Sequence, residues 1–359
     1  MNRTITIVAP GRICLFGDHQ DYLGLPVIAC AINREVQLSS KENRTQNFHI
    51  KMPDIRSERT IPITKTFETL EKEDHFASAL RVVRRYGCVP DRGFDVLLKS
   101  TIPINAGVSS SSAIVVAWIH FLLKAFGANR SITNEFIGQL AYEAEVIEHN
   151  SPGGKMDQYT ISLGNIVFLN TTEDLSFKII GTELESLILG ESGVPKKTLG
   201  LLADLRGKAQ DAIAEVEQHL PDFCLEKVTP DTVDRYSSYI SEELKPYFYA
   251  AIQNHSITQK ALLEFGKENL DHKAIGELMS AHHKVLKDIL KITVPVIDKM
   301  INAALEAGAY GAKIVGSGGG GSIIALVPGD KKEAIIKAIR ENGAIDAYEV
   351  SVVQGTHIL

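Results

Sequence analysis

The sequence predicts an α+β protein with a β-rich first half and a helix-rich second half. Short β-branched runs alternate with turns in the first third, and helical periodicity prevails after about residue 200. Near residue 316 a glycine-rich segment separates two apolar strands. The length of 359 residues is enough for two domains. We expect these domains at 1–180 and 181–359, with the boundary between about 165 and 195.

The individual elements follow from periodicity and from turn residues. The expected strands of the first half are the runs TITIVAP, LPVIACAI, EVQLSS, FHIKM, FDVLLKSTIP and NIVFLNT. Helices are expected at 75–87, from the serines at 109–112 to Gly127, and over about 133–149. Later helices are expected at about 201–218, 232–252, 257–266, 271–290 and 294–308, followed by a strand–glycine–strand hairpin, a helix and a last strand.

The composition excludes several classes of protein. Hydrophobic residues make up 44% of the chain and charged residues 23%, as in an ordinary globular protein. A net charge of −6 without a long basic run argues against nucleic acid as a partner. The scattered cysteines (Cys14, Cys30, Cys88, Cys224) indicate a reducing compartment. The chain start and the stretch 113–126 are too short for a signal peptide or a membrane span. We therefore expect a cytoplasmic monomer or homodimer without membrane contact.

The glycine-rich segment formally matches the dinucleotide-binding fingerprint G-x-G-x-x-G at Gly316, Gly318 and Gly321. That fingerprint requires a strand before the glycines and a helix after them. Here SIIALVP follows, which is β-branched, short and closed by proline, so it predicts a second strand. An NAD-dependent enzyme is therefore excluded, and the glycines must serve another purpose.

A serine-rich turn, IPINAGVSSSSA, precedes the apolar helix that ends at Gly127. A helix N-terminus offers free N–H groups and the positive end of the dipole, which suits phosphate. Serine hydroxyls add donors and can ligate Mg²⁺. The alternative is a cluster of N-capping serines without a ligand. The chain lacks G-x-x-x-x-G-K-[ST], so a Walker-type ATPase is excluded.

Two further segments concentrate charged side chains near turns. PGRICLFGDHQDYLG carries Arg12, Asp18, His19 and Asp21, which can bind phosphate and sugar hydroxyls or can simply form a solvated hairpin turn. In SPGGKMDQYTISLG, Asp157 follows a Pro-Gly-Gly turn, where it can accept a substrate proton or cap the next helix.

Three other polar positions carry less information by themselves. Glu145 lies near the edge of an apolar helical stripe, a position that spacing alone assigns to solvent. His282 and His283 are adjacent on an expected helix, so they point about 100° apart and are interpreted as structural.

Three of these segments together resemble the GHMP kinase family, in the form typical of its galactokinase members. PGRICLFGDHQDY is similar to the first family motif, PINAGVSSSSA to the second, and GAKIVGSGGGGSIIALV to the third, glycine-rich motif. The resemblance implies a two-domain fold with a ribosomal-protein-like βαβ N-terminal domain and a ferredoxin-like C-terminal domain. It also implies transfer of the γ-phosphoryl group of ATP to the anomeric hydroxyl of a monosaccharide, with Mg²⁺ as cofactor.

The resemblance assigns roles residue by residue. Asp157 matches the catalytic aspartate, as base or orienter of the sugar hydroxyl, and Arg12 the arginine that pairs with it. Ser111 and Glu145 match the Mg²⁺ ligands, although the choice among four consecutive serines is uncertain by one. The sugar-binding positions are Asp18, His19, Asp21, Gly154 and Lys155. The ATP-binding positions are Gly107, Ser109, Ser110, Ser111, Ser112, Gly318 and Gly319.

Three departures from the family pattern leave the sugar open. Asp18 stands where the family has glutamate, and Lys155 replaces an apolar residue. After residues 192–194 galactokinases have a tyrosine near the sugar, and the stretch 195–206 has none. Lys155 can either pair with an anionic substituent of the substrate or point to solvent. The alternatives to galactose are therefore a uronic acid, a heptose phosphate, arabinose or an amino sugar, and a sensor that binds sugar and ATP without turnover.

Overall fold

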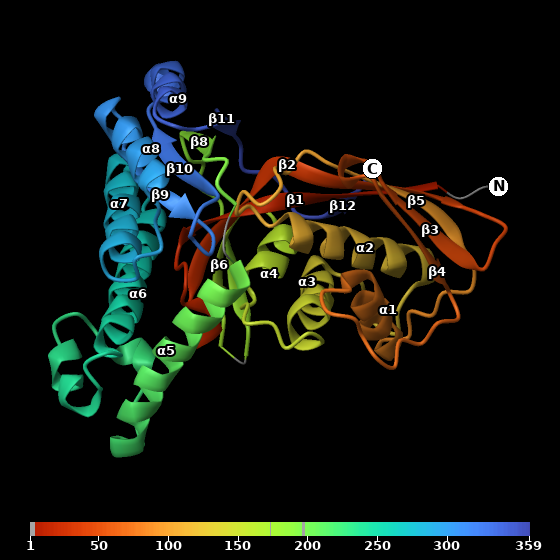
Figure 1. The fold of residues 1–359 in the computed structure, drawn as a ribbon, viewed down its shortest axis with the longest axis horizontal. Coiled ribbons are helices and arrows are strands. Elements are labelled where there is room, and N and C mark those ends of the chain that lie inside the picture. The colour runs from red at the N-terminus through yellow and green to blue at the C-terminus, as the bar shows by residue number, and fades with distance from the viewer. Residues whose placement is uncertain (1–3, 173, 196–197) are drawn as a thin grey trace.

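The structure, a computed structural model, describes residues 4–172, 174–195 and 198–359. It contains two β-sheets, each packed against its own helices (Figure 1). The larger sheet belongs to the first half of the chain, and the smaller sheet to the second half. The chain passes from one to the other between Ile180 and Ser186. This architecture confirms the predicted α+β class.

The larger sheet has the order β12-β1-β2-β5-β3-β4, and β6 joins it by pairing with β2 and with β7. The strands are β1 Thr4–Phe16, β2 Val27–Glu42, β3 Asn47–Met52, β4 Ser57–Pro62, β5 Phe94–Ser100, β6 Ile166–Asn170, β7 Ser176–Ile180 and β12 His357–Ile358. Strands β3 and β5 are parallel neighbours, and the chain between them includes a helix. The last strand, β12, returns from the second half of the chain to pair with β1.

The helices of the first half pack below the larger sheet (Figure 1). They are α1 His75–Arg85, α2 Ser110–Phe126, α3 Asn134–Tyr142, a π-helix Glu143–Ile147 and α4 Met156–Leu163. Helix α2 is apolar almost all round, which is typical of a helix inside a core. Its Trp118 and Phe121 are fully buried and contact Phe48 of β3 edge to face. This packing fixes the serine-rich start of α2 relative to the sheet.

The smaller sheet has the order β11-β8-β10-β9 and is antiparallel throughout. Its strands are β8 Ser186–Glu191, β9 Gly311–Val315, β10 Ser322–Val327 and β11 Asp346–Val350. The helices are α5 Thr198–His219, α6 Lys245–Phe265, α7 His272–Asp288, α8 Pro295–Glu306 and α9 Lys332–Glu341. The alternation β-α-β-β-α-β is the ferredoxin-like arrangement that the resemblance implied. The glycine segment between β9 and β10 is a hairpin, as predicted.

In the second half, the predicted start of a helix at about 232 was wrong, and the two helices predicted at 232–252 and 257–266 are a single helix. The region 232–252 begins with the short 3-10 turns Val233–Arg235 and Ser237–Tyr239, and the helix starts only at Lys245, with proline in its first turn. Proline suits a helix start and not its interior. Helix α6 then continues without a break through 257–266. Strands β7 and β8 were missed because runs of 5 and 6 residues give little periodicity. Within the described ranges no helix is long and apolar enough to cross a bilayer.

The C-terminal segment that follows β11 packs against Gly164, the glycine that ends α4. Gly164 forms an isolated bridge with Gln354, and the amide of Thr356 donates to the carbonyl of Ile161. An added Cβ at Gly164 would overlap the backbone of Gly355. Gly127, which ends α2 with the same φ of 75°, has no atom within 4 Å of that position. The two glycines therefore share a backbone conformation and differ in their surroundings.

This pair predicts a difference in stability. We expect Gly127→Ala to lower the free energy of unfolding by roughly 1–3 kcal/mol, because alanine is strained at this positive φ. Gly164→Ala should cost about 1–3 kcal/mol more, because the backbone of the C-terminal segment must move. Urea denaturation of both variants measures the difference. Equal free energies of unfolding would contradict the close packing of the C-terminal segment on α4.

Candidate active site

One cavity of about 860 Å³ is lined by segments that lie far apart in the sequence. They are the end of β1 with the loop that follows it, residues 72–75, the turn before α2, residues 145–158, the start of α5 and the glycine hairpin. The predicted residues that line it are Arg12, Asp18, His19, Asp21, Ser109, Ser111, Ser112, Glu145, Gly154 and Asp157. The structure thus brings together residues from all three motifs.

The side chains of Arg12 and Asp157 form a forked ion pair beside this cavity. Arg12 Nε donates to Asp157 Oδ1 and Arg12 Nη2 donates to Asp157 Oδ2, each at 2.7 Å. The third guanidinium nitrogen, Nη1, donates to the carbonyl of Gly107 at 2.6 Å. Burial by itself would lower the pKa of Arg12, but the charge and hydrogen bonds of Asp157, together with smaller effects of Cys14 and Asp18, outweigh burial and raise that pKa. The guanidinium therefore stays charged.

Both partners owe their position to local structure. Arg12 lies in β1 just after a register shift between Pro10 and Gly11, where two residues of β2, Asn33 and Arg34, are left out of the pairing as in a β-bulge. Bulges redirect side chains and are frequent beside active sites. Asp157 lies in the first turn of α4, as the Pro-Gly-Gly turn predicted. Ser109, the N-cap residue of α2, donates its hydroxyl hydrogen bond to Asp157 Oδ2.

The two predicted metal ligands face each other across the start of α2. Ser111 Oγ donates to Glu145 Oε1 at 3.0 Å, and Gln158 Nε2 donates to Glu145 Oε2 at 2.7 Å. Glu145 lies in the π-helix, a form that often marks functional sites. One carboxylate with one hydroxyl fits Mg²⁺, which is commonly held by few protein oxygens together with substrate phosphates. Among the described residues no cluster of three His, Cys, Asp or Glu side chains could hold a metal alone.

Asp21 is held against the start of α4. Its Oδ2 accepts from the amide of Met156 at 3.3 Å and its Oδ1 from the amide of Tyr22 at 3.0 Å. An added Cβ at Gly154 would overlap this carboxylate, so only glycine permits the approach. Burial first, and then the charge of Asp157, raise the pKa of Asp21 to about 6. The cavity therefore contains two carboxylates, those of Asp21 and Asp157, whose negative charges repel one another.

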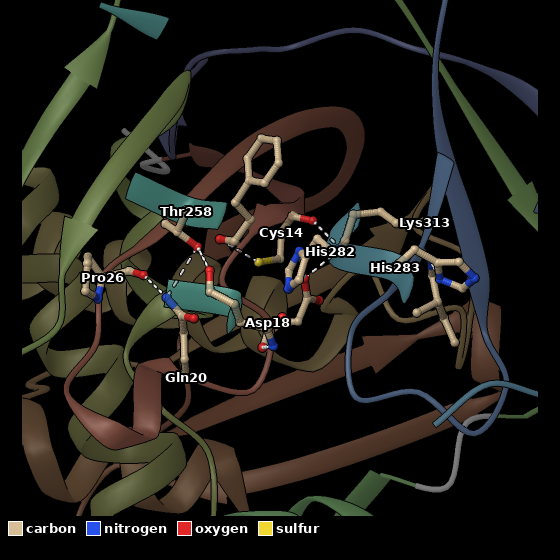
Figure 2. A network of polar contacts seen from close by, with 11 residues as sticks. Cys14, Asp18, Gln20, Pro26, Thr258, His282, His283 and Lys313 are labelled. Atoms are coloured by element: carbon tan, nitrogen blue, oxygen red, sulfur yellow. Dashed lines mark hydrogen bonds and ion pairs between the residues drawn. The ribbon is translucent and has the colours of Figure 1, made fainter. Parts of the chain in front are cut away.

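Asp18 has a partner that the sequence did not reveal. Lys313 of β9 donates from Nζ to Asp18 Oδ2 at 2.6 Å, and both side chains are buried (Figure 2). Sequence reasoning missed this lysine because AKIV was interpreted only as an apolar strand. The one available signal was a charge at the centre of that strand. His282 and His283 are buried, in keeping with their structural interpretation.

Other predicted residues lie beside the cavity without lining it. Lys155 Nζ donates to the carbonyl of Thr172 at 2.6 Å. Gly318 packs against Ile292, and the amide of Gly319 donates to the Ile292 carbonyl at 2.7 Å. The hairpin residues that do line the cavity are Gly316 and Ser317. Ligand roles for Lys155, Gly318, Gly319, Gly107 and Ser110 stay predictions.

The remaining predicted features are His19 and the stretch that lacks a tyrosine. His19 adopts a left-handed φ of 62° and its Nδ1 lies 3.2 Å from the hydroxyl of Tyr22. Burial lowers its pKa, so the ring is neutral at neutral pH. Residues 196–197 lie outside the described residues. The part that follows them contributes Gly200, Leu202 and Ala203 to the cavity.

Comparison with known proteins agrees with this geometry. The GHMP kinases N terminal domain matches residues 74–165, and GHMP kinases C terminal matches residues 259–345. The galactokinase galactose-binding signature matches residues 2–39. The chain therefore belongs to the GHMP kinase family, and it is a phosphotransferase. Within that family it is galactokinase-like, and the family uses ATP with, typically, a divalent metal.

The individual relatives are distant, and they include both mevalonate kinases and galactokinases. The mevalonate kinase of Thermococcus gammatolerans is 27% identical over 340 residues, covering 92% of this chain and 91% of the relative. The galactokinase of Bacillus subtilis is 27% identical over 345 residues, covering 92% and 87%. The fold is similar to that of Lactococcus lactis galactokinase complexed with galactose, with a TM-score of 0.89, 22% identity, and coverage of 99% and 95%. Identity alone therefore does not select the substrate.

The raised pKa of Asp21 predicts a pH dependence of stability. A carboxyl group whose pKa is raised by folding to about 6 holds its proton more tightly in the folded chain. Its contribution to the free energy of unfolding is fully present below about pH 4 and is lost as the pH rises through about 6, on the order of 3 kcal/mol in total. Relative to Asp21→Asn, the free energy of unfolding of the unsubstituted protein should therefore decline between about pH 4 and 7. A constant difference between the two proteins over this range would contradict the assignment.

Proposed function

We propose that this kinase transfers the γ-phosphoryl group of ATP to the anomeric hydroxyl of a monosaccharide, with galactose as the leading candidate. The observation that carries the proposal is the Arg12–Asp157 pair and its place in the cavity. The same cavity holds the serine-rich helix start and Glu145, which suit a nucleotide phosphate chain. It also holds Asp18 and Asp21, whose oxygens suit sugar hydroxyls.

The proposed reaction is a direct displacement at phosphorus. The anomeric oxygen forms a bond to the γ-phosphorus, the bond from that phosphorus to the bridging oxygen breaks, and ADP leaves. Asp157 orients the hydroxyl and accepts its proton, while Arg12 stabilises the negative charge of the transferring group. Ser111 and Glu145 would hold Mg²⁺ together with phosphate oxygens, and the ion would neutralise phosphate charge.

The charges around the cavity favour a neutral sugar over mevalonate. A polyol can donate hydroxyl hydrogen bonds to Asp18 and Asp21, whereas a carboxylate substrate would be repelled by them. Among the described residues that line the cavity, the lysine and arginine side chains are Arg12 and Lys72. Arg12 is engaged by Asp157. Lys72 precedes α1, whose contacts include α2, α3 and the π-helix that carries Glu145.

The role of Asp157 gives a direct prediction. Replacing it with asparagine removes the proton acceptor and leaves the side-chain shape, so turnover should fall by ~10² to 10⁴. The measurement is ATP consumption coupled to ADP release, with ATP affinity and the thermal midpoint determined on the same samples. Near-full turnover by Asp157→Asn would refute the assigned role.

The substrate is tested with a panel in the presence of ATP and Mg²⁺. The panel comprises galactose, arabinose, N-acetylhexosamines, galacturonate, glucuronate, heptose 7-phosphate and mevalonate, with Lys155→Ile assayed alongside. Turnover of a neutral sugar, unaffected by the Lys155 change, supports the proposal. Turnover of an acidic sugar that is lost with Lys155 would assign that lysine to specificity. Turnover of mevalonate alone, or ATP binding without any turnover, would contradict a sugar kinase.

A further inference from the structure

A buried polar network joins the glycine hairpin to the loop that follows β1 (Figure 2). Lys313, in the middle of β9, is 0% exposed. Besides its ion pair with Asp18 Oδ2, its Nζ donates to the carbonyl of Cys14 at 3.0 Å. Lys313, which belongs to the smaller sheet, thus contacts the end of β1 at Cys14 and holds Asp18 in the loop at 17–21.

Burying the charged side chain of Lys313 in β9 costs free energy, which other interactions in the fold must offset. All five residues of β9 are buried, and an apolar side chain would satisfy an ordinary core strand. A buried ammonium group is tolerated only with a charged partner and further hydrogen bonds. Asp18, which is 2% exposed, and the Cys14 carbonyl supply them. The pairing therefore links two segments of the active site rather than adding to the apolar core.

The loop is also supported from its other side by α6. Asn254 Nδ2 donates to the carbonyl of Asp18 at 3.5 Å, and Gln20 Nε2 lies 3.4 Å from Thr258 Oγ1 (Figure 2). Beyond Lys313, β9 ends at Val315 and runs directly into the hairpin residues that line the cavity. Strand β9 thus carries Lys313, which holds the loop at 17–21 through Asp18, and leads into the glycine hairpin.

We propose that Lys313 is a positioning residue for phosphoryl transfer, which acts by clamping Asp18 and so aligns the substrate loop with the glycine hairpin. The ion pair with Lys313 occupies Asp18 Oδ2. Asp18 Oδ1 is buried and accepts no hydrogen bond from the described residues, so it can accept one from the substrate. This inference rests on the proposed function in one respect, namely that the loop at 17–21 binds the sugar.

The electrostatics agree with this geometry. Burial would raise the pKa of Asp18, but the charge and hydrogen bond of Lys313, together with the neighbouring imidazoles of His282 and His19, outweigh burial, and the pKa is lowered. Burial and the same lysine lower the pKa of His282 to about 3, so that imidazole is neutral at neutral pH while Lys313 is in place. The titratable groups that face Asp18 are Lys313 from β9, His282 from α7, and Cys14, Arg12 and His19 from β1 and its loop. Helix α6 contributes the uncharged Asn254.

The first test needs no substrate, so its result is independent of the proposed function. Hydrogen exchange of the backbone amides at 17–24 is compared between the full-length protein, Lys313→Met, and Lys337→Met, whose lysine side chain is 74% exposed on α9. We expect exchange in this loop to be about tenfold faster or more in Lys313→Met, and unchanged within about twofold in the control. Unchanged exchange in a folded Lys313→Met variant would overturn the proposal.

The second test separates positioning from a general loss of structure, with D-galactose as the first probe. Lys313→Met should raise the KM for the sugar about tenfold or more while the KM for ATP changes less than about threefold, and Lys313→Arg should recover most of the loss. The double variant Asp18→Asn/Lys313→Met, which removes both buried charges, should match Asp18→Asn alone, because residues that act through one another are not additive. Additive losses, or equal rises in both KM values, would overturn the proposal.

Discussion

The forked ion pair between Arg12 and Asp157 is the constraint around which the site is assembled. An arginine fork fixes a carboxylate in two directions at once, which a lysine cannot do. Because Arg12 also donates to the carbonyl of Gly107, and Ser109 donates to Asp157, the pair ties β1, the turn before α2 and the first turn of α4 to one another. Three segments far apart in the sequence therefore meet at one carboxylate.

Close backbone approach makes this meeting possible. Gly107 adopts a φ of +87°, and an added Cβ there would lie 2.7 Å from the carbonyl of Val315, at the end of β9. The turn before α2 therefore rests directly on the end of β9, where the glycine hairpin begins. Together with the Lys313–Asp18 pair, this contact places β9 against both the turn before α2 and the loop that follows β1. The glycines of the third motif thus serve backbone packing around a cavity and not a Rossmann turn.

Local signals account for what the sequence could predict. The starts of α1, α2 and α7 and the hairpin follow from short stretches of sequence, whereas the grouping of Arg12, Asp18 and Asp157 in one site followed from the resemblance to the GHMP kinase family. Features that depend on long-range packing were out of reach. The π-helix that presents Glu145 has no sequence period of its own, and Lys313 finds its partner only across the two sheets. Likewise, three-dimensional packing alone decides that Gly316 and Ser317, and not Gly318 and Gly319, line the cavity.

The central claim is that this site directs the γ-phosphoryl group to the anomeric oxygen of a sugar. The most direct test is nuclear magnetic resonance of the product formed from ATP, Mg²⁺ and galactose, or whichever panel sugar is turned over. The account predicts a sugar phosphate whose phosphorus couples to the anomeric proton. A phosphate on any other hydroxyl, or the release of inorganic phosphate without a sugar phosphate, would contradict it.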